Sequence, residues 1–180
     1  MENIAPVVPE EYSRKSWKHW IDEDRDCQDT RQEVLVAESS TPVVFQDEKE
    51  CRVISGTWVD PYTGNTYVDP SVLDIDHVVA LKDAHLSGGD SWGAIRREAF
   101  ANDLTNSASL RSVYRSANRS KGARGPDEWL PTNPDFRCQY IREYLGVKQM
   151  WGLRPSESQK AVLEYMQKIC SDGEVPTLPQ

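Results

Sequence analysis

The clearest hydrophobic periodicity lies toward the carboxyl end of the chain, where two stretches repeat apolar residues every three to four positions. This spacing predicts helices over 135–151 and 156–169. Another helix is predicted over 30–39, because helix-forming residues there follow Asp29 or Thr30 as an N-terminal cap. Shorter helices are expected over 12–21 (with Trp17 and Trp20 on one side), 91–102 and 114–121.

Alternating residues rich in β-formers predict strands within 51–68, with a turn at 60–64 between them. Further strands are expected over 72–81 and around 106–113. The ends are expected to be flexible, as a lead-in at 1–11 and a tail at 171–180. The pattern therefore predicts one α+β domain over 12–170, and 180 residues provide room for one compact core.

Apolar runs are too short for a membrane helix, which needs roughly 20 consecutive apolar residues. The first residues also lack the apolar region of a signal peptide. We therefore expect no membrane association, in a protein that is either cytoplasmic or secreted with its mature end at the start of this sequence.

The formal net charge of −8 argues against a protein that coats nucleic acid by bulk electrostatics. One short stretch, 111–124, nevertheless has five basic residues and no acidic one. They are Arg111, Arg115, Arg119, Lys121 and Arg124. We expect phosphate contacts from Arg115, Arg119 and Lys121, and an ordinary solvated face is the alternative.

The four cysteines, Cys27, Cys51, Cys138 and Cys170, form no C-x-x-C pair, which disfavours a structural zinc site. An even number of widely spaced cysteines suits two disulfides in an oxidising compartment. Of the three connectivities we favour Cys27–Cys51 and Cys138–Cys170, since each closes a local loop. In the loop-entropy model each bond would stabilise the fold by about 3–4 kcal/mol. Four reduced, buried cysteines are the alternative.

Three short strings carry the candidate chemistry: DIDHVV at 74–79, DLTNSASL at 103–110 and SANRSKG at 116–122. Phosphodiester hydrolysis needs an activated water and a group that neutralises charge on the phosphate. A neutral imidazole at His77 can take the proton from water, and Asp76 with Asn118 offers the hard oxygen ligands that magnesium prefers. Because Asp76 and His77 point to opposite faces of a strand, the strand must bend or end there.

The spacing of these strings resembles the ββα-metal motif (the His-Me finger) of HNH endonucleases, including the HNH domain of RNA-guided DNA nucleases. The resemblance extends over 12–170 through CQDTRQEVL, CRVISGTWVDPYTG and DEWLP to small, often secreted HNH proteins with GmrSD-like C-terminal domains. It implies an α+β fold with a ββα-metal core at about 72–122, a β-hairpin, and flanking N- and C-terminal helices.

The resemblance also implies roles for single residues. Asp76 and Asn118 would be the metal ligands, His77 the general base and Asp74 a carboxylate beside the metal. Asn106 would be the middle asparagine that ties the loop between the two halves of the motif. Many HNH proteins bind the metal with a histidine where this chain has Asn118, so Mg²⁺ or Mn²⁺ is expected rather than zinc or nickel.

Two features outside the motif have competing interpretations. Arg31 is a candidate to stabilise charge on the phosphate, as is Arg119, and a salt bridge is an equal alternative for Arg31. Four acidic residues also occupy positions 1, 3, 5 and 12 of a calcium-loop pattern, although its sixth position is a cysteine instead of glycine. These are Asp22, Asp24, Asp26 and Glu33. They either bind a structural Ca²⁺ or only interact favourably with the positive N-terminal end of the following helix.

Together these observations predict an endonuclease that cuts DNA, with RNA as a second substrate, and shows little sequence preference. No segment resembles a sequence-reading module such as a helix-turn-helix. A monomer is expected. The competing classes are a nucleic-acid-binding module without activity and an extracellular calcium-binding module with the same fold.

Overall fold

The computed structural model describes residues 11–178, so the predicted lead-in lies outside the described residues except for its last position. The helices are α1 (Thr30–Glu38), α2 (Leu81–Leu86), α3 (Ala94–Ala101), α4 (Arg115–Lys121), α5 (Pro134–Trp151) and α6 (Glu157–Ser171). The strands are β1 (Val44–Phe45), β2 (Val53–Ser55), β3 (Trp58–Val59), β4 (Thr66–Tyr67), β5 (Leu73–His77) and β6 (Leu110–Tyr114). The predicted α+β class is confirmed.

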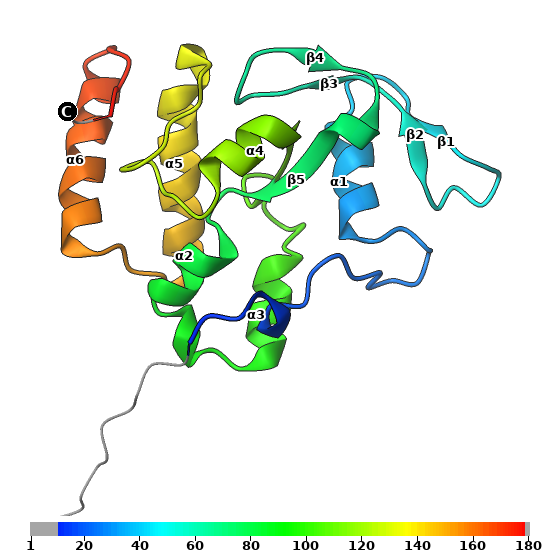
Figure 1. Cartoon of the computed structure of the whole chain (residues 1–180), viewed down its shortest axis with the longest axis horizontal. Helices are drawn as coiled ribbons and strands as arrows, with labels where there is room; N and C mark the ends of the chain where they lie inside the picture. The colour runs from blue at the N-terminus through cyan, green and yellow to red at the C-terminus, as the bar shows by residue number, and fades with distance from the viewer. Residues whose placement is uncertain (1–10, 179–180) are drawn as a thin grey trace, which may run out of the picture.

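The strands form three small antiparallel pairs: β1 with β2, β3 with β4, and β5 with β6. The β5–β6 pair is the longest, with a register that runs from Leu73 opposite Tyr114 to His77 opposite Leu110. Helix α4 follows β6 directly and packs against both strands (Figure 1). Two strands and a helix therefore form one unit, and α2 and α3 lie in the connection between β5 and β6.

Strand β5 lies between two hydrophobic clusters. Leu73 and Ile75, which share one face of the strand, pack with α1, Trp58 and Leu110. Val78 and Val79, just after the strand, belong instead to the larger cluster with α5 and α6. The end of β5 is therefore held from both sides, which is what a rigid site requires.

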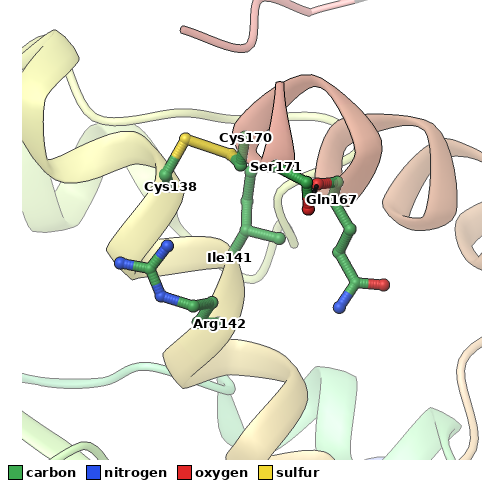
Figure 2. Close-up of a pocket in the computed structure, with 6 residues that line it drawn as sticks. All are labelled: Cys138, Ile141, Arg142, Gln167, Cys170 and Ser171. Atoms are coloured by element: carbon green, nitrogen blue, oxygen red, sulfur yellow. Dashed lines mark hydrogen bonds between the residues drawn. A yellow bond between two sulfur atoms is a disulfide. The ribbon is translucent and has the colours of Figure 1, made fainter. Parts of the chain in front are cut away.

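Both favoured disulfides are confirmed: Cys27 is bonded to Cys51, and Cys138 to Cys170. The second one joins the start of α5 to the end of α6, where Ile141 and Gln167 lie beside it in a surface pocket (Figure 2). The two long helices lie side by side (Figure 1). No cysteine is left free.

The long predicted helices are present at nearly their expected bounds, and Asp29 caps α1 through a 3.0 Å hydrogen bond from the Gln32 amide. The predicted helix at 12–21 is wrong, because only a 3-10 turn at Arg14–Ser16 forms there. Buried Trp17 and left-handed Trp20 (φ 59°) commit this segment to tertiary contacts that a helix would break.

The strand predicted at 72–81 is shorter than expected and ends at His77. The last residue of the predicted range, Leu81, instead begins α2 after Ala80. Sequence analysis missed this helix, as well as the β1–β2 pair. The described part of the predicted tail is also ordered by contacts, since Pro176 is buried and its carbonyl oxygen accepts a 3.2 Å hydrogen bond from Arg137. Among residues 11–178 no helix is both long and apolar enough to cross a bilayer.

Candidate active site

The motif residues meet in one open pocket at the end of β5. Asp76, His77, Asn118 and Arg119 all line it, although they come from a strand and from helix α4. The other lining residues are Tyr12, Arg14, Ile75, Ala80, Leu81, Lys82, Gly122 and Ala123. The strand ends at His77, so the chain can present two consecutive side chains to the same pocket, as the sequence required.

His77 is held as a neutral imidazole. Its side chain is almost fully buried, and its Nε2 lies 2.9 Å from the carbonyl oxygen of Ala101. A carbonyl only accepts, so Nε2 carries the proton and Nδ1 keeps its lone pair. Burial lowers the pKa of His77 to about 3, against the opposing hydrogen bond to Ala101. Among the described residues no hydrogen bond occupies Nδ1, and His77 lines the pocket.

Asp76 is a buried carboxylate with two fixed partners. The Tyr62 hydroxyl donates to its Oδ2 at 2.6 Å, and the Lys121 Nζ lies 3.0 Å from each of its oxygens. Burial raises the pKa of Asp76, and the Lys121 cation and the hydrogen bonds from Tyr62 and Lys121 oppose the rise. The Lys121 Nζ also donates to the His77 carbonyl at 2.9 Å, so one ammonium group fixes both motif residues of β5.

Asn118 contacts the other carboxylate of the strand. Its Nδ2 donates to Asp74 Oδ2 at 3.3 Å, and Arg119 Nε lies 3.9 Å from the same oxygen. Asp74 is partly exposed, unlike Asp76. Because Nδ2 points to Asp74, the carboxamide oxygen of Asn118 is available to another partner.

These donors fit a hard divalent cation. A carboxylate has about four lone-pair positions, so Asp76 can accept a further partner besides Tyr62 and Lys121. With the Asn118 carboxamide oxygen it would supply the kind of oxygen pair that magnesium prefers. Asp74 lies beside Asn118, as expected for a carboxylate that orients a ligand.

Among the predicted site residues that do not line this pocket are Lys121, Arg31 and Asn106. The Lys121 side chain has no solvent exposure, so the predicted phosphate contact is wrong and its ammonium group serves Asp76 instead. Arg31 donates to the carbonyl oxygens of Pro70 and Leu73 at 2.9 and 3.0 Å, which fixes the start of β5, and it lines a different pocket.

Asn106, the predicted loop residue, does stabilise the loop before β6. Its Oδ1 accepts from the Ala108 amide at 3.0 Å, and its side chain lies in a pocket away from His77. Asp103 contributes more to this loop, because it accepts from Thr105, Ser109 and Trp151 at 2.6 to 3.2 Å. Sequence analysis did not identify this role of Asp103.

The arginines of the predicted basic stretch divide into exposed ones and ones held in internal contacts. Arg115 and Arg119 are exposed, as phosphate contacts must be. Arg111 instead forms ion pairs with Glu38 and Glu143, and Arg124 donates to the carbonyl oxygens of Ser120 and Lys121. Sequence analysis missed two other exposed cations on the pocket rim, Arg14 and Lys82.

The calcium-loop pattern at residues 22–33 is partly assembled. Asp22, Asp24 and Asp26 are exposed and bring oxygens within 4.8 Å of one another. Cys27, in the position where such a loop needs glycine, adopts a left-handed φ of 77° despite its disulfide. Burial and then these carboxylates raise the pKa of Glu33. Calcium binding here stays a prediction, and isothermal titration of calcium tests it.

Comparisons with known proteins identify a family for this chain. The family model for the C-terminal domain of GmrSD restriction endonucleases matches residues 29–163. A relative described as an uncharacterized secreted protein of Arthroderma benhamiae is 36% identical over 168 residues, which are 93% of this chain and 80% of the relative. No solved structure matches the chain.

Proposed function

Because the chain belongs to the family of the C-terminal domain of GmrSD restriction endonucleases, we propose that it is a metal-dependent HNH endonuclease. It hydrolyses phosphodiester bonds of DNA with little sequence preference, and RNA is the second substrate to test. The observation that carries the proposal is the single pocket lined by Asp76, His77 and Asn118.

His77 acts as the general base through Nδ1. The proton on Nε2 is held by the Ala101 carbonyl, so the Nδ1 lone pair can accept a proton from water. The water oxygen attacks phosphorus, and the bond to the departing 3′ oxygen breaks. A pKa of about 3 ensures the neutral form at pH 7 but makes a weak base. The negative charge of a bound phosphate favours the protonated imidazole and so raises its basicity.

A divalent cation, Mg²⁺ or Mn²⁺, would be held by Asp76 and Asn118 and would neutralise charge on the phosphate and the leaving oxygen. Tyr62 and Lys121 keep the Asp76 carboxylate in one orientation. Exposed Arg119 on the pocket rim contacts the phosphate backbone, together with Arg14 and Lys82. Few such cations predict a shallow dependence of affinity on salt.

The test is cleavage of plasmid DNA and of RNA in Mg²⁺, Mn²⁺ and Ca²⁺, with and without EDTA. We expect EDTA to stop cleavage, and His77→Ala to lower kcat roughly 100-fold or more, the upper part of the range for a general base. Asn118→Ala removes a proposed metal ligand and should lower kcat at least as strongly. Asn65→Ala, at an exposed asparagine in the β3–β4 turn, should cleave normally.

Full activity of His77→Ala would exclude this mechanism. Binding of DNA without cleavage in any of the three metals would instead support the competing class, a nucleic-acid-binding module without activity. Discrete cuts on a long natural DNA would contradict the low sequence preference.

We also propose that the protein functions outside the cytoplasm as a monomer. The two disulfides support an oxidising compartment, and the relative from Arthroderma benhamiae is described as secreted. Purification from culture medium with both bonds intact, at the mass of one chain by light scattering, is the expected result.

A further inference from the structure

The segment before α1 reaches the motif histidine although it lies outside the family match, which begins at residue 29. The Trp20 ring stacks on the His77 imidazole, with centroids 5.4 Å apart and planes 20° apart. His19 forms a T-shaped pair with the same imidazole, with centroids 6.3 Å apart and an interplanar angle of 83°. Two consecutive residues therefore pack on His77.

The backbone at this contact is strained. Trp20 adopts a φ of 59°, a left-handed conformation that is unfavourable for an L-residue. Asn102 holds the chain on both sides of the strained residue: its Nδ2 donates to the Lys18 carbonyl at 2.9 Å and its Oδ1 accepts from the Ile21 amide at 3.2 Å. Strain that neighbouring contacts maintain is typical of functional sites.

Asn102 also follows Ala101, whose carbonyl accepts the proton of His77 Nε2. The end of α3 therefore holds the imidazole and the segment that covers it. The hydrogen bond to Ala101 fixes one point of the ring but permits rotation about the line from Nε2 to that oxygen. The Trp20 ring opposes this rotation, because turning the imidazole would give up the stacked arrangement.

His19 is itself held by two hydrogen bonds. Its Nδ1 lies 2.8 Å from the Trp17 carbonyl, and its Nε2 lies 3.3 Å from an Arg14 nitrogen. Trp17 is fully buried, which anchors this arrangement in the larger hydrophobic cluster.

We propose that Trp20 is a positioning residue for His77, which by stacking on the imidazole keeps Nδ1 directed into the pocket. This inference rests on the proposed function of His77 as general base. The segment at 12–21 is then part of the working site.

The experiment compares Trp20→Ala, Trp20→Phe and Trp92→Ala in the full-length protein. Trp92 is a matched control, because it is a partly buried tryptophan that packs on Trp17, Phe100 and Trp151 and has no ring contact with His77. Each variant is measured for Tm, for kcat and KM on DNA, and for the ring-proton NMR signals of His77. The chain has three histidines, so a His77→Ala spectrum assigns the signals.

We expect Trp20→Ala to lower kcat roughly 10- to 100-fold, the effect of a small misplacement, and to change KM less than about threefold. The His77 ring signals should move downfield as the shielding indole is lost. Trp20→Phe should restore most of kcat, because it keeps a flat ring. Trp92→Ala should lower Tm and leave both kcat and the His77 signals unchanged.

Unmoved His77 signals in Trp20→Ala would overturn the inference, and so would a kcat loss that Trp92→Ala reproduces at equal Tm. If the wild-type protein cleaves nothing, the proposed function fails while the NMR comparison still decides whether Trp20 stacks on the imidazole. If His77→Ala abolishes cleavage and Trp20→Ala keeps it, the proposed function stands and the positioning role falls.

Discussion

Two aspartates of this chain, the buried Asp76 and the partly buried Asp83, have nearly the same partners. Asp76 accepts a 2.6 Å hydrogen bond from the Tyr62 hydroxyl and pairs with Lys121 at 3.0 Å. Asp83 on α2 accepts a 2.6 Å hydrogen bond from the Tyr144 hydroxyl and pairs with Lys148, also at 3.0 Å. We name these the Asp76 cluster and the Asp83 cluster; each contains one carboxylate, one phenol and one buried ammonium group.

The surroundings of the two clusters differ. In the Asp83 cluster the Lys148 ammonium also donates to Ser87 and Gln159, at 2.8 and 3.0 Å, so its three protons are all used inside the protein. The Gln159 amide in turn donates to Tyr144 at 2.8 Å. This closed network joins α2, α5 and α6.

The Asp76 cluster has an open side instead, because Asp76 lines the pocket that contains His77 and Asn118. The difference teaches that the partners of a buried carboxylate do not decide its role. A closed polar network holds elements together, whereas the same group with one side on a pocket can take a further ligand.

The largest expected effect is on the stability of the closed cluster. Lys148→Met leaves the mostly buried Asp83 carboxylate without its cation, and breaking a buried ion pair in this way costs about 3–5 kcal/mol. Urea unfolding measures the loss. Adding Asp83→Asn to Lys148→Met should recover part of it, because the uncompensated charge is then gone.

The protein that remains folded in Lys148→Met should cleave DNA with the wild-type kcat. A loss below about 1 kcal/mol, the range of exposed ion pairs, would show that the cluster is not closed. A fall in kcat at full folding would show that it is coupled to the active site.

A smaller effect is expected for the equivalent change in the open cluster. In Lys121→Met water can reach Asp76 from the pocket, so we expect a stability loss of about 1–3 kcal/mol. The ammonium group also repels a divalent cation at the same carboxylate. Saturating Mn²⁺ should therefore raise the Tm of Lys121→Met more than it raises the Tm of the wild type.

Equal Tm increases in the two proteins would place the cation away from Asp76, and Asp74→Asn and Asp76→Asn would then be compared in the same assay. The partly exposed Asp74 is the alternative ligand, since it already contacts Asn118.

How much of this could be predicted depends on the range of the contacts. The helices at 30–39, 135–151 and 156–169 and both disulfides followed from periodicity, capping and loop length, which are local properties. The meeting of Asp76, His77 and Asn118 in one pocket followed from a motif in which two short strings have a set order.

What failed involves partners far apart in sequence. Nothing near Lys121 shows that its ammonium group is buried against Asp76, 45 residues away, so a basic stretch was assigned to phosphates. Tyr62 lies in a turn whose residues predict only a hairpin. The helix predicted at 12–21 has a helical pattern, but Trp20 makes its contact with His77 from a left-handed backbone that no helix contains.

The smallest predicted effect is the dependence of stability on pH that Tyr144 gives to the Asp83 cluster. Burial, and then the Asp83 carboxylate, raise the pKa of Tyr144 above its ordinary value. The folded protein therefore binds this proton more tightly than the unfolded one does, so the contribution is complete below the unfolded pKa of about 10 and is lost as pH rises. Above that pH, Tyr144 should lower stability by about 1.4 kcal/mol per pH unit.

Tyr144→Phe should reduce the slope of unfolding free energy against pH by this amount, whereas Tyr165→Phe, at an exposed tyrosine, should leave it unchanged. Equal slopes in wild type and Tyr144→Phe would mean that water enters the Asp83 cluster, and the contrast with the open cluster would then fail.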